Sequence, residues 1–406
     1  MSAICRACDS DNLTVVLSLG KTPLANALLT SEQLKETEGT YPLDLAFCSN
    51  CSLVQITETV PAEKLFREYL YFSSFSDTVL QNAKEIVNRL IVNRKLDNTS
   101  FVVEVASNDG YLLQYYHQRA IPVLGIEPAV NIAKVAQEKR GIRTISEFFG
   151  KKLAEQLRED SESADIIHAN NVLAHVADLN GFVAGISLLL KEDGIAVIEV
   201  PYVKDLIDGV EFDTIYHEHL CYFSLTALNR LFQRHGLLIT EVERLPIHGG
   251  SLRIFAGKSG NSSSTVQTML QYEAEWGVDD LLFYQSFGSK VEHLRGNLLT
   301  LLRELKAKNK RIAVYGASAK GSTLLNYFGL GKETLDFVVD RSTIKQGYYT
   351  PGTHLSIYDP SKLLETLPDY VLLLTWNFAE EILTQQAEYR AHGGHFIIPI
   401  PELKIV

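Results

Sequence analysis

The stretch FVVEVASNDGYLL, residues 101–113, decides the fold class of this chain. Its opening run, FVVEV, is rich in β-branched residues and predicts a buried strand. The small and polar residues that follow predict a tight turn, and the apolar residues after them predict a helix. Backbone N–H groups at the start of such a helix face a ligand beyond the strand end, and Gly110 permits close approach to the backbone. The stretch therefore predicts the first strand, turn and helix of an α/β domain with a cofactor pocket.

Strand-like runs continue to alternate with amphipathic segments up to about residue 258. Further apolar runs occupy residues 123–128, 164–170 and 194–201. This alternation predicts a mainly parallel sheet with helices on both faces. The last two runs, 236–245 and 250–258, have no long helix between them, so they predict an antiparallel hairpin at the edge of that sheet.

Polar residues follow the ends of the predicted strands. Glu127, in GIEP, comes 23 positions after Glu104 and can accept hydrogen bonds from both ribose hydroxyls of a nucleoside cofactor. The spacing suits NAD or S-adenosylmethionine, although the turn lacks the G-x-G-x-x-G fingerprint of dinucleotide sites. Asn170, Asn171 and His175 lie in the loop at the end of the run 164–170, where the edge of a cofactor would lie. An alternative interpretation of His175 is a histidine at the start of a helix that bonds to the backbone. The predicted cofactor-binding residues are Glu104, Ala106, Asn108, Gly110, Glu127, Pro128, Asn170, Asn171 and His175.

Four of the five cysteines form two Cys-x-x-Cys pairs near the N-terminus: Cys5 with Cys8, and Cys48 with Cys51. Two such turns can complete a closed tetrahedral thiolate shell, which is typical of structural zinc. A redox dithiol is the alternative, but it is normally a single motif beside a βαβ unit, which this segment does not resemble. We therefore expect a structural zinc ion that folds the N-terminal segment.

The run IYHEHLCYFS, residues 215–224, concentrates titratable and aromatic groups. A zinc-protease motif is excluded, because it requires His-Glu-x-x-His and here a His follows the Glu directly. A neutral histidine in such a cluster can instead remove a proton from a carbon next to a carbonyl group. The run therefore predicts general base chemistry.

Two further motifs suggest ligand contacts. Paired glycines and an arginine in HGGSLR, residues 248–253, suggest an anion or sugar contact, with an ordinary hairpin turn as the alternative. The run VYGASAKGST, residues 314–323, resembles a phosphate-binding turn, but it lacks the P-loop lysine after its second glycine, so nucleotide hydrolysis is not expected. It opens a second strand–helix cycle, which predicts a smaller Rossmann-type domain without an assigned cofactor.

The length of the chain limits the number of domains, and its charge limits the classes of partner. The 406 residues suit two to four domains, and 38 basic against 49 acidic side chains give a formal charge of −11. This excess of acid disfavours a nucleic-acid partner, and no apolar run reaches the ~18 residues of a membrane span. We expect a soluble, cytoplasmic protein that acts on a small molecule. The expected units are a zinc-binding domain at 1–75, a cofactor-binding domain at 76–260, a helical connection at 261–310 and a C-terminal domain at 311–406.

Taken in order, the paired Cys-x-x-Cys motifs, LGKTPLAN, YLYFSSFS, EVASNDGYLL, GIEP, IYHEHLCYFS, HGGSLR and VYGASAKG resemble the sugar C-methyltransferases that act on nucleotide-linked deoxyhexoses. The resemblance spans essentially the whole chain. It implies an N-terminal zinc-binding domain, a central class I methyltransferase domain and a C-terminal Rossmann-like domain that helps to enclose the substrate. It also implies S-adenosylmethionine as methyl donor. The implied acceptor is a thymidine- or guanosine-diphosphate 4-keto-6-deoxy sugar, methylated at C3.

The same resemblance assigns roles to individual residues. It implies that His219 is the base, that Glu218 and Tyr216 assist it, and that Tyr71 lies near the sugar. We expect substrate contacts from His248, Arg253, Ser318 and Lys320, and a monomer or weak oligomer. Two other functions stay open: an NAD-dependent nucleotide-sugar reductase or epimerase, and a non-catalytic, zinc-stabilised binding protein.

Overall fold

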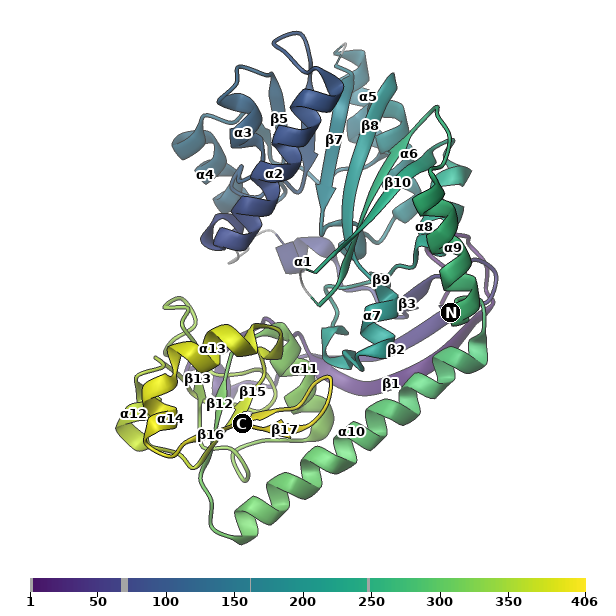
Figure 1. Cartoon of the computed structure of the whole chain (residues 1–406). Coiled ribbons are helices and arrows are strands. Elements are labelled where there is room, and N and C mark those ends of the chain that lie inside the picture. The colour runs from purple at the N-terminus through teal and green to yellow at the C-terminus, as the bar shows by residue number, and fades with distance from the viewer. Residues whose placement is uncertain (1–2, 67–71, 161, 247–248) are drawn as a thin grey trace.

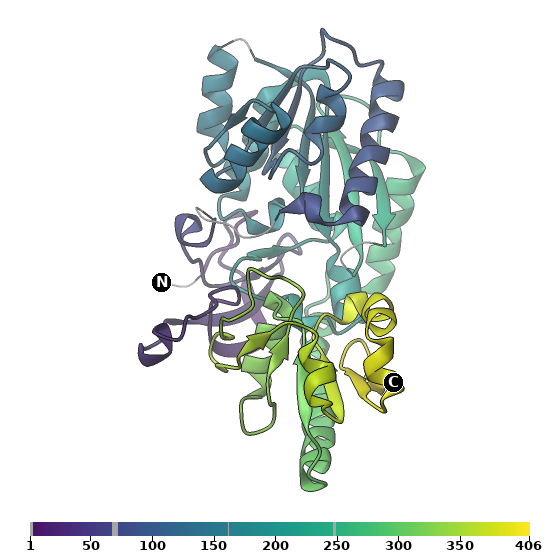
Figure 2. The ribbon, with the colours of Figure 1, turned by 90° about the vertical axis from the view of Figure 1, so that its left-hand side faces the viewer.

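The computed structural model describes residues 3–66, 72–160, 162–246 and 249–406. These residues form three sheets, one in each of three units (Figure 1). The central unit carries the longest sheet, and the N-terminal and C-terminal sheets lie side by side along one end of it (Figure 2). No helix within the described ranges is both long and apolar enough to cross a membrane.

The central sheet has seven strands in the order β10-β11-β8-β7-β4-β5-β6. The strands from β4 to β8 are parallel, and β11 is antiparallel to both β8 and β10. This is the class I methyltransferase arrangement, so the expected fold class and the edge hairpin are confirmed. The bounds are β4 Val102–Val105, β5 Val123–Ile126, β6 Thr144–Ile145, β7 Ala164–Asn170, β8 Leu190–Pro201, β10 Leu238–Leu245 and β11 Ser251–Gly257.

Helices cover both faces of this sheet, which explains why its inner strands are almost continuously apolar. All four residues of β4 are buried, for example. Helices α2, α3 and α4 pack on one face, and α5, α6 and α8 on the other. Their bounds are α2 Asp77–Arg94, α3 Leu113–His117, α4 Val130–Arg140, α5 Lys151–Glu159, α6 Leu179–Leu189 and α8 Leu225–Arg234.

The N-terminal sheet is antiparallel, in the order β1-β2-β3-β9. Three of its strands come from the first 56 residues: β1 Leu13–Pro23, β2 Thr40–Cys48 and β3 Val54–Ile56. The fourth, β9 Cys221–Tyr222, comes from the run IYHEHLCYFS. The N-terminal sheet is therefore completed by a segment that lies far away in the sequence.

Helices α9 Ser264–Trp276 and α10 Leu281–Ala307 lead to the C-terminal unit, and α10 packs along β1 (Figure 1). The C-terminal sheet has the order β14-β13-β12-β15-β16-β17, parallel except for the last strand. Its elements are β12 Ile312–Tyr315, α11 Ala319–Phe328, β13 Val338–Val339, β14 Ile357–Tyr358, α12 Lys362–Thr366, β15 Tyr370–Leu373, α13 Ala379–Gln385, α14 Ala387–Ala391, β16 His395–Ile398 and β17 Lys404–Ile405.

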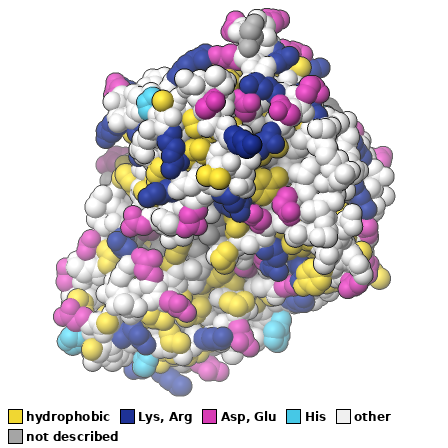
Figure 3. All heavy atoms as spheres, turned by 45° about the horizontal axis from the view of Figure 1, so that its top comes forward, with side chains coloured by type: hydrophobic (Ala, Val, Ile, Leu, Met, Phe, Trp, Pro, Cys, Tyr) yellow, Lys and Arg dark blue, Asp and Glu magenta, His cyan; other side chains and the backbone are white. Residues whose placement is uncertain are grey.

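The remaining helical elements are short, and all of them except η1 contribute residues to the site described below. They are η1 Gln33–Lys35, α1 Ala62–Phe66, η2 Ser73–Phe75, η3 Leu173–His175, α7 Val203–Asp208, η4 Phe212–Thr214 and η5 Trp376–Phe378. On the face drawn in Figure 3, basic side chains are interspersed with acidic ones. Such a mixture does not favour a phosphate-tracking nucleic-acid surface.

Candidate functional site

A cavity of about 700 Å³ lies at the carboxyl ends of β4, β5 and β7, and we call it the first cavity. Open α/β sheets bind ligands at this edge. The cavity collects most of the residues predicted for the cofactor, although they come from separate parts of the chain. The predicted residues in its lining are Ala106, Asn108, Glu127, Pro128, Asn170, Asn171 and His175 from the cofactor set, and Tyr216, His219, Ser318 and Lys320 from the other sets.

The turn after β4 has the strained backbone that often marks a functional site. Ala106, Asn108 and Gly110 have φ values of 54°, 48° and 76°. A left-handed conformation costs about 1–2 kcal/mol for a residue such as alanine. The Asn108 N–H donates to Glu127 Oε2 at 2.9 Å, and the Ala129 N–H donates to Oε1 at 2.9 Å. Glu127 is thus fixed at the cavity wall, with lone pairs left for ribose hydroxyls.

Glu104 and Gly110 lie outside the lining, unlike the other predicted cofactor residues. Glu104 is fully buried, and this burial raises the pKa of its carboxyl group well above the usual value. A Cβ atom on Gly110 would lie 3.1 Å from Ile142 Cγ1. The glycine therefore serves the positive φ and the close packing of the turn, whereas we expected it to serve approach of the ligand.

His175 combines the two interpretations that the sequence left open. Its Nδ1 lies 2.6 Å from the Glu218 backbone oxygen, which is the backbone bond of the simpler interpretation. Its ring also lines the first cavity, 4.8 Å from the His219 ring centre. Burial lowers the pKa of His175, so the neutral ring is favoured at neutral pH.

His219 is held by a hydrogen bond on each ring nitrogen. Its Nδ1 lies 3.1 Å from the Thr214 backbone oxygen, and its Nε2 lies 3.0 Å from the Tyr216 hydroxyl. A carbonyl oxygen can only accept, so Nδ1 of the neutral ring carries the hydrogen and Nε2 carries the lone pair. The arrangement presents a basic nitrogen in the cavity wall.

The YHEH segment, residues 216–219, faces two ways. Tyr216 and His219 line the first cavity, whereas Glu218 does not. Asn26 Nδ2 donates to both Glu218 carboxylate oxygens, at 2.8 and 2.9 Å. Burial raises the pKa of Glu218 to about 7, and the bond from Asn26 opposes this rise. His217 Nε2 lies 3.0 Å from the Pro42 backbone oxygen. Half of the segment therefore contacts the N-terminal unit.

Asn26 is a residue whose role the sequence did not predict. It ends the run LGKTPLAN, which contributed to the resemblance without an assigned function. Its partner Glu218 lies 192 positions away. Tyr71 and His248, which were predicted near the substrate, lie outside the described residues.

The C-terminal unit contributes Ser318 and Lys320 to the lining. Ser318 caps α11, since its Oγ accepts from the Gly321 N–H at 3.0 Å. Lys320 Nζ lies 4.3 Å from the centre of the Trp376 ring and has no hydrogen-bonding partner among the described residues. Sequence reasoning missed Glu211, which also lines the cavity. Burial raises the pKa of Glu211 to about 7, and the charge of Lys320 opposes this rise.

A second cavity, of about 1040 Å³, adjoins the first. The two share Tyr111, Asn170, Asn171, Glu211, Asn377 and Phe378 among other residues, so they form one continuous site. Five aromatic side chains line the second cavity: Phe72, Phe75, Tyr111, Trp376 and Phe378. No local sequence pattern predicts this cavity, because its walls come from segments that are distant in the chain.

Arg253 lines neither cavity, although a ligand contact was expected of it, and two of its partners, Asn82 and Glu199, line the second cavity. Its guanidinium forms ion pairs with Glu199 at 2.6 Å and Glu243 at 3.0 Å, and its NH2 donates to Asn82 Oδ1 at 2.8 Å. Its charge is thus already compensated inside the protein. The structure gives Arg253 a part in the packing of β8, β10 and β11 and not in the lining of the site.

We expect Arg253→Leu to lower the free energy of unfolding by about 3–5 kcal/mol, because it leaves the buried Glu199 carboxylate without its partner. Denaturant unfolding of the central unit measures this loss. Arg341→Leu is the matched control, since its ion pair with Glu381 is exposed and should contribute no more than about 1 kcal/mol. Equal effects of the two changes would contradict the assigned role.

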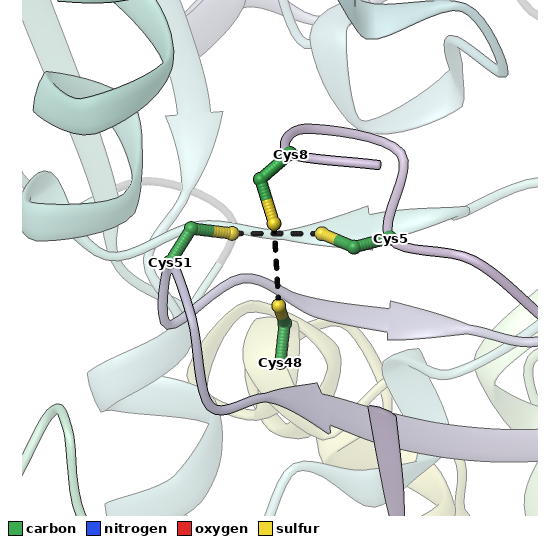
Figure 4. Close-up of side chains that lie close together, drawn as sticks. All are labelled: Cys5, Cys8, Cys48 and Cys51. Atoms are coloured by element: carbon green, nitrogen blue, oxygen red, sulfur yellow. Dashed lines mark hydrogen bonds between the residues drawn. The ribbon is translucent and has the colours of Figure 1, made fainter. Parts of the chain in front are cut away.

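The four N-terminal cysteines converge on one point (Figure 4). Two Sγ pairs, Cys5 with Cys51 and Cys8 with Cys48, are separated by 3.5 Å, and all four Sγ atoms lie within 4.8 Å of one another. A tetrahedral shell with Zn–S bonds of about 2.3 Å requires sulfur separations of about 3.8 Å. The cysteines are free thiols and fit a structural zinc ion, whose shell they fill completely.

Comparison with known proteins agrees with a zinc-binding N-terminal unit and a methyltransferase fold. Three family models match in succession: "Putative zinc binding domain" over residues 5–66, "Methyltransferase domain" over 76–242 and "C-methyltransferase C-terminal domain" over 246–401. The chain is 36% identical over 405 residues to the C-methyltransferase NovU of Streptomyces niveus, which covers 99% of this chain and 96% of NovU.

Two solved structures each match less than half of this chain. The PH0226 protein of Pyrococcus horikoshii OT3 matches 47% of this chain and 95% of its own, at 12% identity and a TM-score of 0.38. Magnesium protoporphyrin IX methyltransferase of Synechocystis PCC 6803 matches 44% of this chain and 79% of its own, at 13% identity and a TM-score of 0.35.

Proposed function

This chain belongs to the C-methyltransferase family, and from that premise we propose that it methylates C3 of a nucleotide-diphosphate 4-keto-6-deoxy sugar. It is an S-adenosylmethionine-dependent enzyme with a structural zinc ion. The observation that carries the proposal is the position of His219. Its unprotonated Nε2 lines the same cavity as the cofactor loop after β4.

The proposed reaction begins with removal of a proton. A carbonyl at C4 acidifies the hydrogen on C3, and His219 Nε2 accepts it, leaving an enolate on the acceptor. The Thr214 carbonyl then stabilises the imidazolium through the Nδ1 hydrogen, 3.1 Å away. The Tyr216 hydroxyl, 3.0 Å from Nε2, can turn to donate to the enolate oxygen. S-Adenosylmethionine, when bound along Glu127 and Asn108, supplies an electrophilic methyl group to the enolate carbon.

The second cavity suits the nucleotide end of the acceptor. Phe75 and Phe378 are 78% and 51% exposed, so their rings are accessible to a nucleobase. Aromatic stacking is worth about 1–3 kcal/mol per base. Ser318 and Lys320, which line the adjoining first cavity, are the proposed contacts of the diphosphate, since the Lys320 ammonium has no hydrogen-bonding partner among the described residues.

Trp376 provides a direct test of the nucleotide site. The protein has two tryptophans, so Trp276→Phe leaves Trp376, which lines the second cavity, as the only indole in the protein. We expect thymidine or guanosine diphosphate to quench the fluorescence of this variant at saturable concentration. Adding Phe378→Ala should raise the Kd about tenfold or more, because a stacking surface is lost. Unchanged fluorescence with both nucleotides would overturn the placement.

The cofactor and the methylated carbon need separate tests. S-Adenosylhomocysteine should raise the Tm and NADH should not; the reverse result would favour the reductase or epimerase. A C4 carbonyl acidifies C5 as well as C3, so NMR of the product must show the new methyl group on C3. A methyl group on C5 would keep the base chemistry and overturn the proposed position. Absence of methyl transfer to any keto sugar would favour a non-catalytic protein.

A further inference from the structure

The residues just before the YHEH segment rest on the C-terminal unit. Phe212, in η4, is fully buried and stacks on Phe328 of α11, with ring centres 5.1 Å apart and an interplanar angle of 19°. Phe212 also packs at a tilt against Tyr327, at 5.8 Å. This contact places the chain from 212 to 215 against a helix that begins more than 100 residues later.

Two hydrogen bonds add to this packing. Trp376 Nε1 donates to Asp213 Oδ2 at 2.7 Å, and Thr323 Oγ1 donates to the Ile215 backbone oxygen at 3.1 Å. Asp213 is fully buried and Thr323 is 3% exposed, so water does not compete freely for either bond. The residues on both sides of Thr214 are therefore anchored to the C-terminal unit.

The backbone oxygen of Thr214 is the acceptor of the His219 Nδ1 hydrogen, at 3.1 Å. The Tyr222 hydroxyl approaches the same oxygen at 3.4 Å. A peptide unit is planar, so the direction of this carbonyl depends on the backbone angles of Thr214 and Ile215. The two anchors restrain these angles. The C-terminal unit thus acts, through one carbonyl, on the tautomer and the direction of the proposed base.

We propose that Thr323 and Trp376 are positioning residues for His219. The C-terminal unit then orients the base and sets its tautomer, in addition to enclosing the substrate. The proposal rests on the proposed function. Without the anchors, the Thr214 carbonyl can turn away, and the His219 ring loses the bond that places its lone pair on Nε2. A misplacement of 1 Å can reduce a reaction rate by about 10²-fold. Cofactor binding, which depends on the turn after β4, should be unaffected.

Exchange of the acceptor's own hydrogen isolates the proton-removal step. The enzyme with bound S-adenosylhomocysteine is mixed with thymidine-diphospho-4-keto-6-deoxyglucose in D₂O, and NMR follows the replacement of hydrogen by deuterium at C3. His219 removes the hydrogen, the imidazolium exchanges it for deuterium from D₂O, and a deuteron returns to the same carbon, so water is the only other reactant. We expect exchange in the wild-type protein, and a rate about tenfold or more lower in Thr323→Val, with the Kd of S-adenosylhomocysteine unchanged.

Further variants separate positioning from general damage. Thr323→Ser keeps the hydroxyl and should restore exchange. Thr366→Val is the matched control, because it removes a hydroxyl bonded to the Lys362 backbone oxygen within the C-terminal unit and away from η4. Trp376→Phe keeps a stacking ring but loses the N–H, so it should lower kcat more than it raises the acceptor KM. Its control is Trp276→Phe, which loses a bond to Asp208.

Each outcome has one meaning. If the wild-type protein catalyses no exchange with this sugar or the guanosine analogue, the proposed function fails. If the wild-type protein exchanges and Thr323→Val exchanges at the same rate, the positioning role is overturned while the function stands. Equal losses of exchange and of S-adenosylhomocysteine affinity in Thr323→Val would also overturn it, because they indicate general disruption. If Thr323→Val does not fold, the kinetics of Trp376→Phe test the proposal. A fall in kcat that exceeds the rise in the acceptor KM supports the positioning role, and an unchanged kcat overturns it.

Discussion

His219→Asn is expected to reduce methyl transfer by about 10²–10⁴-fold, the range that a general base contributes. Asparagine retains a polar group of similar reach, but its amide is not basic and cannot accept the C3 proton. The Kd of S-adenosylhomocysteine should change little, because the turn after β4 and Glu127 are independent of the imidazole. Transfer of label from S-adenosylmethionine to the keto sugar measures the effect, under single-turnover conditions so that product release does not limit the rate.

The matched control is His293→Asn on α10, where the ring bonds to the exposed Asn297 side chain. This variant should keep wild-type activity. Activity of His219→Asn within about threefold of wild type would remove His219 as the base and direct attention to His175, whose ring centre lies 4.8 Å away. A loss of cofactor affinity that matched the loss of rate would indicate a binding role instead.

The local parts of this structure follow from the sequence. The Cys-x-x-Cys spacing predicted a thiolate cluster, because each pair needs only a tight turn to reach one ion, and the four Sγ atoms do converge. The strand and turn of residues 101–110 were predictable for the same reason, since they depend on neighbours in the chain. The alternation of strands and helices predicted the central fold, which the handedness of βαβ units restricts to few topologies.

The contacts between units did not follow from the sequence. Asn26 bonds to Glu218 across 192 positions, and Trp376 bonds to Asp213 across 163. No local pattern marks such pairs, because they depend on how separately folded units pack together. Arg253 shows the opposite case: its motif suggested a ligand, but its position on β11, between β8 and β10, buries it among carboxylates.

The zinc-bound unit has a structural connection to the proposed base. Strand β3, which begins three residues after Cys51, pairs with β9 through Val54 and Tyr222. The Ile56 N–H also donates to the Leu220 backbone oxygen at 3.0 Å, next to His219. The zinc ion stabilises the turn that leads into β3. The cysteine cluster lies outside the lining of both cavities but is connected, through β3 and β9, to the segment that carries His219.

Loss of zinc should therefore cause the second large effect. Structural zinc contributes about 10–16 kcal/mol in small zinc-finger peptides, and a small sheet without it cannot bury enough apolar surface. We expect Cys48→Ser, or prolonged chelation, to unfold β1–β3, to expose residues 216–222 and to lower methyl transfer about 10²-fold or more. Hydrogen exchange of 40–56 and 216–222 measures the structural loss, and elemental analysis measures the metal.

The fifth cysteine supplies the control for this experiment. Cys221 is fully buried on β9 and pairs with Gln55, but it does not belong to the thiolate cluster. Cys221→Ala should therefore keep about one zinc ion per chain and native protection of residues 40–56, with only the modest destabilisation of a small core truncation. Metal-free Cys48→Ser protein with native protection of residues 216–222 would show that the base segment is stable without zinc. That result would confine the role of the metal to its own turn and contradict the connection through β3 and β9.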